Sequence, residues 1–247
     1  MKKVICAIII IAILVFAGYK LYPMLNKEEN VNTTKEEVEN TQVENQAKEE
    51  EKETTVSNED MYKEVIDSYK NAYKEFDFED MDIEEKLEAK YKLVSLTLIE
   101  HVARYHEDGI NLTYEFYDIN NDGKDELIVG ASGSPGAIYS LSDENVVPIF
   151  FQDTMERGSL SIYDNGVILS SGAGGAALHY YEFGKITKDS TYEALEKIEE
   201  EYEEGKDIPV YRDTVTSKVL NYKSYDEIAE KYLDNANEVK LESYKEI

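Results

Sequence analysis

Hydrophobic positions divide the chain into parts that differ in the spacing of their apolar side chains. An uninterrupted run comes first, with 16 uncharged residues from Val4 to Tyr19. After a polar stretch, apolar residues recur at helical spacing, then at every second position beyond Gly109, and again at helical spacing after Ser190. A period of about 3.6 residues is typical of a helix that is buried on one side, and alternation is typical of a strand. The order of these patterns predicts the fold class α+β.

Two amphipathic helices are expected at the start of the folded part. One set of apolar positions extends from Met61 to Phe76, and a second set extends from Leu87 to Tyr105. The pattern breaks near residues 77–82 and at Gly109. These segments predict an N-terminal helical hairpin whose apolar faces pack on the rest of the molecule.

The central part predicts an antiparallel β-meander of about six or seven strands. Leu112, Tyr114 and Phe116 alternate with polar neighbours, and Asn165-Gly166 is a strong hairpin signal. The glycine-rich segments 132–136 and 172–175 are expected to be turns. The further strands are expected near residues 126–131, 136–141, 145–151, 159–163, 166–171 and 177–183.

The C-terminal part predicts helices separated by one strand. Ser190 and Glu193 have the spacing of a capping box, and Gly205 is a suitable helix end. Ser224 and Glu227 repeat the capping spacing before a second amphipathic segment. Between these helices, residues 215–222 are expected to form a strand.

The N-terminal run predicts a location outside the cytoplasm. Lys2 and Lys3 precede the apolar residues, as in secretion signals and membrane anchors whose positive end stays inside. Residues 1–25 are therefore interpreted as a membrane anchor or signal peptide. A retained single-pass anchor, with the N-terminus inside and the module outside, is favoured over secretion after cleavage, because apolar residues continue past Lys20.

Charge separates a predicted stalk from the folded module. Residues 26–60 contain four lysines and twelve acidic residues, a net charge of −8, and no aromatic residue, so we expect a disordered acidic stalk. Residues 61–247 form the predicted α+β extracellular module, with 19 basic and 41 acidic residues. The whole chain has a net charge of −27, which argues against nucleic acid as a partner. Its one cysteine excludes an intrachain disulfide and a cysteine-rich metal site.

One segment carries a metal-binding pattern. Residues 118–130 read Asp-Ile-Asn-Asn-Asp-Gly-Lys-Asp-Glu-Leu-Ile-Val-Gly. Oxygen-bearing side chains fall at positions 1, 3, 5 and 9, a glycine allows the sharp turn at position 6, and position 7 offers a backbone carbonyl. Such a loop suits calcium, which prefers six to eight oxygen ligands. A hairpin turn without metal is the alternative interpretation. The predicted calcium ligands are Asp118, Asn120, Asp122, Lys124 and Glu126.

This loop resembles the calcium loops of integrin-type FG-GAP repeats, Asp-x-Asn-x-Asp-Gly-x-x-Asp-Leu. It departs from that pattern at position 9, where Glu126 replaces the usual Asp, and it occurs once instead of several times. The resemblance therefore implies the calcium loop but not a propeller. More loosely, residues 60–235 resemble exported surface proteins of low-GC Gram-positive bacteria, which implies a surface location without an established activity.

Three functions remain open at this point. The favoured one is a membrane-tethered, non-catalytic module with one structural calcium, which binds an envelope protein or a small ligand. The second is an extracellular hydrolase with a cleft near the glycine-rich turns, which requires a pocket where His179, a serine and a carboxylate converge. The third is a subunit of a larger envelope complex, which predicts an exposed patch of tyrosine and apolar side chains.

Overall fold

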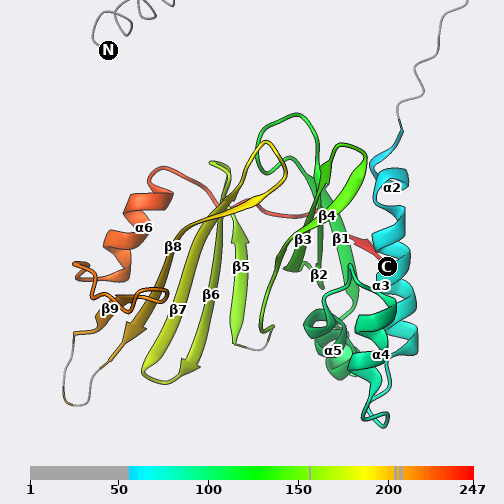
Figure 1. The fold of residues 1–247 in the computed structure, drawn as a ribbon, viewed down its shortest axis with the longest axis horizontal. Coiled ribbons are helices and arrows are strands. Elements are labelled where there is room, and N and C mark those ends of the chain that lie inside the picture. Colours follow the sequence, from blue (N-terminus) through cyan, green and yellow to red (C-terminus); the bar gives the residue numbers. More distant parts are fainter. Residues whose placement is uncertain (1–55, 156, 203–204, 206–207) are drawn as a thin grey trace, which may run out of the picture. The chain divides into compact units, whose positions relative to one another are not determined.

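Two antiparallel sheets of five strands lie next to each other, and helices cover the outer face of each sheet (Figure 1). The computed structural model describes residues 56–155, 157–202, 205 and 208–247. These residues belong to the unit Glu53–Ile247. The predicted anchor and residues 26–55 of the predicted stalk lie outside the described residues. Within the described ranges, no helix is long and apolar enough to cross a membrane.

The first sheet has the strand order β10-β1-β2-β3-β4, and the second has the order β5-β6-β7-β8-β9. All neighbouring strands are antiparallel. The strands are β1 (Leu112–Tyr117), β2 (Glu126–Ala131), β3 (Ser134–Ser142), β4 (Asn145–Phe151), β5 (Gly158–Ile162), β6 (Val167–Gly175), β7 (Leu178–Ile186), β8 (Tyr192–Glu201), β9 (Val210–Asp213) and β10 (Lys245–Glu246).

The helices fall into two groups. Four precede the strands in the sequence and belong to the layer on the first sheet. One follows β9 in the sequence and packs on the second sheet (Figure 1). The Ser95 and Ser224 hydroxyls cap two of them by accepting hydrogen bonds from backbone N–H groups. The helices are α2 (Asn58–Met61), α3 (Lys63–Glu75), α4 (Ile83–Lys90), α5 (Leu96–Tyr105) and α6 (Tyr225–Leu233), with a 3-10 turn η1 (His106–Asp108) after α5.

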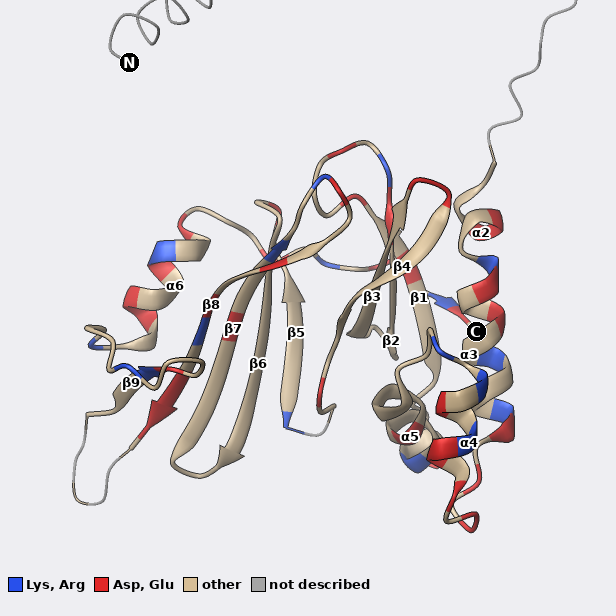
Figure 2. Ribbon diagram, in the orientation of Figure 1, with Lys and Arg blue, Asp and Glu red and all other residues tan. Residues whose placement is uncertain are grey.

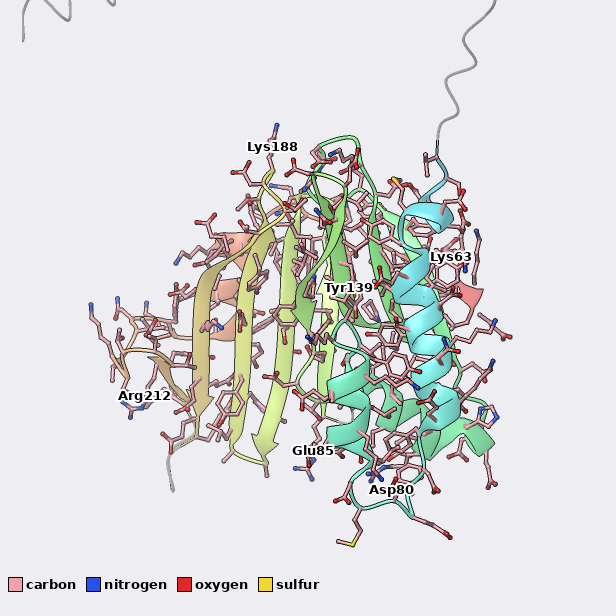
Figure 3. All side chains as sticks on the ribbon, turned by 45° about the vertical axis from the view of Figure 1, so that its right-hand side comes forward. Lys63, Asp80, Glu85, Tyr139, Lys188 and Arg212 are labelled. Carbon is pink, nitrogen blue, oxygen red and sulfur yellow. The ribbon has the colours of Figure 1, made fainter. Side chains whose placement is uncertain are left out.

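Strand alternation produces the layered core. In β2, Leu127 and Val129 face the helices α3 and α5, whereas Ile128 faces the second sheet. All six residues of β2 are buried, as expected for a central strand that is covered on both faces. Tyr139 of β3 lies between the first sheet and α3, where its hydroxyl is 2.7 Å from that of Tyr69 (Figure 3). The second sheet likewise packs one face on the first sheet and the other on α6.

Several predicted elements have the expected positions. The helical segments before residue 106, the hairpin at Asn165-Gly166 and the helix after Ser224 are present. The predicted helix from Leu87 to Tyr105 is two helices, because the chain leaves helical geometry at 91–95 before Ser95 caps α5. The class is broadly α+β, but ten strands replace the expected six or seven, and they form two sheets instead of one meander.

The prediction of a helix after Ser190 is wrong. Residues 192–201 form β8, which pairs with the whole length of β7 and with β9. Ser190 adopts φ 52° in the tight turn before β8, and its hydroxyl donates to the Leu141 carbonyl instead of capping a helix. Pairing on both sides and burial of Ile198 outweigh the strong local helix preference of this glutamate-rich segment.

Two smaller expectations are also corrected. Residues 172–175 are not a turn, because they form the end of β6, and the chain reverses at residues 176–177. The strand expected at 215–222 is reduced to an isolated antiparallel bridge between Val219 and Arg212, and the regular strand of this region is β9. The Asp213 carboxylate ends β9 by accepting hydrogen bonds from the N–H groups of Val215 and Thr216, a turn signal that overrides the apolar residues after it.

Candidate functional site

The predicted metal loop connects β1 to β2. Tyr117 and Glu126 are paired at the base of this hairpin, so both ends of the loop are fixed by the first sheet. Asn121 and Gly123 adopt positive φ values of 56° and 89°. Nothing lies within 4 Å of a side chain built at Gly123, so the backbone conformation, not the available space, requires glycine there.

Acidic side chains organise the backbone of the loop. The Asp118 carboxylate accepts hydrogen bonds from the N–H groups of Asp122, at 3.1 Å, and Gly123, at 2.9 Å. The side-chain oxygen Oδ1 of Asn120 accepts from the same Asp122 N–H at 3.0 Å. The Asp122 carboxylate in turn accepts from the N–H of the exposed Lys124 at 2.9 Å. The first, third and fifth positions therefore share one tightly wound turn.

Glu126 is the buried member of the set. Glu126 is only 1% exposed. Its carboxylate accepts hydrogen bonds from the Ile119 N–H at 2.8 Å and the Ser140 hydroxyl at 2.9 Å. Burial raises the pKa of Glu126 to about 7, and the negative charges of Asp122 and Asp118 add to this increase, whereas the two hydrogen bonds oppose it. A buried carboxylate close to two others favours either a proton or a cation.

The Asn120 amide nitrogen lies among three oxygen atoms. It is 3.3 Å from Asp122 Oδ2, 3.5 Å from Glu126 Oε1 and 3.4 Å from the carbonyl oxygen of Thr187. Thr187 belongs to the turn between β7 and β8, so this group of polar atoms joins the two sheets. Lys188, in the same turn, projects from the same end of the molecule as the loop (Figure 3).

Two buried serines extend the contact between the sheets. The Ser140 hydroxyl of β3 is 3.0 Å from that of Ser190, and Ser190 donates to the Leu141 carbonyl at 2.7 Å. Thr187, Ser140 and Ser190 were not predicted as site residues. No local sequence signal identifies them, because only the packing of the two sheets brings them to residues 118–126.

The remaining acidic residue of the loop has a different role. The Asp125 carboxylate accepts a hydrogen bond from the Asn58 side chain at 2.6 Å, and its carbonyl accepts from the Tyr62 hydroxyl at 2.9 Å. Asp125 thus ties the loop to the start of the helical layer instead of adding to the oxygen group.

Side chains alone do not form a ready metal site. Among the residues that the structure describes, no group of three or more His, Cys, Asp or Glu side chains could hold a metal ion. Oxygen atoms that would complete a shell around a cation come from Asn120, from main-chain carbonyls and from the opposite sheet.

The glycine-rich segments border two hollows. A cleft of about 580 Å³ lies between the sheets and is lined by Gly133, Ser134 and the C-terminal segment 238–242. A smaller pocket of about 380 Å³ contains Gly172 and His179. Clefts therefore lie beside both glycine-rich segments.

The smaller pocket brings serine, histidine and carboxylate groups to one face of the second sheet. The hydroxyls of Ser159 and Ser171 are 2.8 Å apart. Behind the pocket, the buried carboxylate of Glu200 lies 3.9 Å from His179 Nδ1 and accepts a hydrogen bond from Tyr181 at 2.8 Å. Within the described residues, no hydrogen bond joins either serine to His179.

Comparison with known proteins bears on the metal loop. Residues 116–141 match the FG-GAP repeat. The match includes the end of β1, the whole loop, β2 and most of β3, which are the elements that position Asp118, Asp122, Glu126 and Ser140. It spans 26 residues, so it identifies a repeat and not the whole chain. No curated protein and no solved structure matches the chain.

Proposed function

We propose that the chain is a membrane-tethered extracellular module, non-catalytic, which binds a partner or ligand at the cell envelope and uses one structural calcium ion. The FG-GAP match at residues 116–141 supports an extracellular module of this kind. The apolar run at residues 4–19 supports the tether, and the acidic composition suits a soluble, cation-attracting surface. Acidic side chains are spread over the helices, the loops and the end of β8 (Figure 2).

The position of the Asn120 amide carries the calcium proposal. Its nitrogen, a hydrogen-bond donor with partial positive charge, stands among oxygens of Asp122, Glu126 and Thr187. A hard cation suits the same surroundings, because carboxylate, amide and carbonyl oxygens are its preferred ligands. Rotation of the amide would then present the Asn120 oxygen to the ion. The residues that would hold calcium are Asp118, Asn120, Asp122, Glu126 and the carbonyls of Lys124 and Thr187.

Calcium at this place would supply positive charge between three carboxylates. The chain already fixes Asp118 through two loop N–H groups and fixes Glu126 through Ile119 and Ser140. The ion would therefore add little order inside the loop. Its main effect would be to hold the β1–β2 loop of one sheet against the β7–β8 turn of the other.

Thermal unfolding of the full-length chain tests this proposal. Extracellular calcium modules often have dissociation constants near 10⁻⁴–10⁻³ M. We expect 10 mM calcium, compared with EDTA, to raise the Tm by roughly 3–10 °C. Asp122→Ala should abolish this rise. Asp125→Asn is the matched control, because it removes one charge from the same loop but not from the oxygen group, and it should retain the rise.

Two results would overturn the calcium proposal. One is an unchanged Tm of the wild-type chain in calcium. The other is an equal loss of the calcium effect in Asp125→Asn, which would indicate a general charge effect instead of a site.

The pocket at His179 favours a second candidate, an extracellular hydrolase. Glu200 could orient the His179 ring as a general base, and Ser171 or Ser159 could serve as the nucleophile. This function requires a side-chain rearrangement that brings one serine to the ring. Treatment with a fluorophosphonate probe should label the chain at that serine, and His179→Gln should abolish labelling. A wild-type chain that takes up no probe would exclude serine nucleophile chemistry at this pocket.

A further inference from the structure

The edge of β5 that does not pair with β6 borders a cleft between the sheets. This cleft of about 580 Å³ is lined by all of β5, by the turn after β2 and by residues 238–242. Its volume falls within the usual range for binding sites in proteins. In Figure 1, β5 is the strand of the second sheet that lies next to the first sheet, and the C-terminal segment passes from the second sheet to the first.

Backbone groups on this edge can be assigned from the pairing with β6. Ala173 N–H donates to the Arg157 carbonyl at 3.0 Å, and Tyr163 N–H donates to the Val167 carbonyl at 2.9 Å. In an antiparallel pair, alternate residues direct their N–H and C=O groups to the same neighbour. Odd-numbered residues of β5 therefore face β6, whereas Gly158, Leu160 and Ile162 direct their polar backbone groups to the opposite edge.

The C-terminal segment covers only one end of that edge. Val239 N–H donates to the Ile162 carbonyl at 2.8 Å, and Asp164 N–H donates to the Asn237 carbonyl at 3.0 Å. After Val239 the chain leaves β5, and at residue 245 it pairs with β1. Within the described residues, the N–H and C=O groups of Leu160 have no hydrogen-bond partner, although Leu160 is only 4% exposed.

These unpaired groups border a cleft that solvent can enter, so they are available to a partner. Buried N–H and C=O groups are nearly always paired, and an extended peptide supplies the missing partners when it adds as a strand. The lining of the cleft mixes polar side chains with apolar ones, and the apolar ones, including Leu160, Ile162 and Leu241, would receive alternate side chains of a peptide. Glu238, Lys240 and Glu242 form the charged lining, with a net charge of −1.

We propose that this cleft binds an extended basic peptide segment of a partner protein, which adds as a strand to β5 between Gly158 and Ile162. The acidic lining and the net charge of −27 favour basic residues on either side of the apolar ones. The same charge disfavours this chain's own residues 26–60, which have a net charge of −8. This inference specifies the partner class of the proposed binding role and does not depend on calcium.

Amide hydrogen exchange of the full-length chain gives the first test. Without peptide, the N–H of Leu160 should exchange rapidly, whereas those of Ser159 and Ser161, which face β6, should exchange slowly. The probe is the peptide acetyl-Lys-Val-Lys-Val-Lys-amide, which should slow exchange at Leu160. Slow exchange at Leu160 without peptide would mean that residues 240–242 close on β5, and it would overturn the proposal. Protection that increases with protein concentration alone would indicate a second copy as the occupant, with the same consequence.

Chemical variants of the probe test the mode of binding. An analogue that is methylated at every peptide nitrogen keeps the side chains but cannot donate to β5, so we expect it to bind at least about tenfold more weakly. A Glu-Val-Glu-Val-Glu peptide should also bind more weakly, because of the acidic lining. Equal affinity of the methylated analogue would contradict strand addition.

Protein variants locate the contact. The double variant Glu238→Gln/Glu242→Gln should weaken binding of the basic peptide several-fold at low salt and less at high salt. Glu84→Gln/Glu88→Gln, which removes two charges from exposed positions of α4, is the control and should bind normally. Equal weakening by the control would contradict binding in the cleft. All measurements are made in EDTA and repeated in calcium, so that failure of peptide binding is distinguishable from failure of the calcium site.

Discussion

The two ends of the interface between the sheets are closed in different ways. At the Glu126 end of β2, buried polar side chains from both sheets make direct hydrogen bonds. At the Ala131 end of β2, the sheets leave a cleft of about 580 Å³, and the C-terminal segment crosses beside it. The comparison indicates that one end fixes the relative position of the sheets, whereas the other end leaves space for a partner.

The largest difference in unfolding free energy is expected between a core truncation in the middle of the interface between the sheets and one at its open end. Ile138 is fully buried between the sheets, so Ile138→Ala should lower the free energy of unfolding by about 4 kcal/mol. Leu160 belongs to the same core but lines the cleft, where neighbouring groups can relax, so Leu160→Ala should cost about 2 kcal/mol. Urea unfolding of both variants measures the difference. Equal losses would mean that the open end is packed as tightly as the middle.

The polar end should show a pH dependence that the open end lacks. The pKa of Glu126 is about 7 in the folded chain against an ordinary value of 4.5, so protonation stabilises the folded state. Its stabilisation is fully present below pH 4.5 and is lost as the pH rises through 7. In EDTA, wild-type chain should lose about 3 kcal/mol more than Glu126→Gln over this interval. Calcium should remove the difference, because the ion compensates the ionised carboxylate.

A control separates this effect from the general acidity of the chain. Glu193→Gln removes one carboxylate from an exposed position of β8, and its unfolding free energy should follow the wild-type pH dependence. Identical pH profiles for wild type and Glu126→Gln would contradict the raised pKa of Glu126.

Serine substitutions should sharpen the contrast between buried and exposed hydrogen bonds. Ser190→Ala leaves the Leu141 carbonyl without its side-chain donor and should cost about 1–2 kcal/mol. Ser159→Ala removes a hydroxyl that bonds only to Ser171 at an exposed position of β5, and it should change the unfolding free energy by less than about 0.5 kcal/mol. Thermal unfolding of the two variants provides the test. A larger loss of unfolding free energy in Ser159→Ala than in Ser190→Ala would contradict the conclusion that the Glu126 end of β2 fixes the sheets.

Sequence patterns predicted the parts of the molecule that depend on local chemistry. The positions of Asp118, Asn120 and Asp122 predicted a wound acidic loop, and Asn165-Gly166 predicted a hairpin. Both depend on a few consecutive residues whose side chains and φ values determine the turn. The buried strand 126–131 was also evident, because a central strand covered on both faces is continuously apolar after its first residue.

The features that sequence patterns did not predict depend on distant partners. Ser190 has the local signature of a helix cap, but strand pairing on both sides makes the following segment β8. Thr187 and Ser140 contact the loop only because the two sheets pack together. No periodicity shows which hairpin turn of one sheet will meet which loop of the other. The candidate site was therefore predictable as a loop, but its second half was not.

A small and mainly local effect is expected where the C-terminal segment meets the first sheet. The Tyr244 hydroxyl donates to the Gly133 carbonyl, and its ring occupies the space that a side chain at Gly133 would need. Tyr244→Phe keeps the ring and removes one hydrogen bond at a residue that is 39% exposed, so it should lower the unfolding free energy by only about 0.5–1 kcal/mol. Its clearer effect should be local, with faster amide exchange at residues 241–246 and unchanged exchange in the β7–β8 turn. Faster exchange at both places would show that the two ends of the interface open together, and the comparison between a fixed end and an open end would then be wrong.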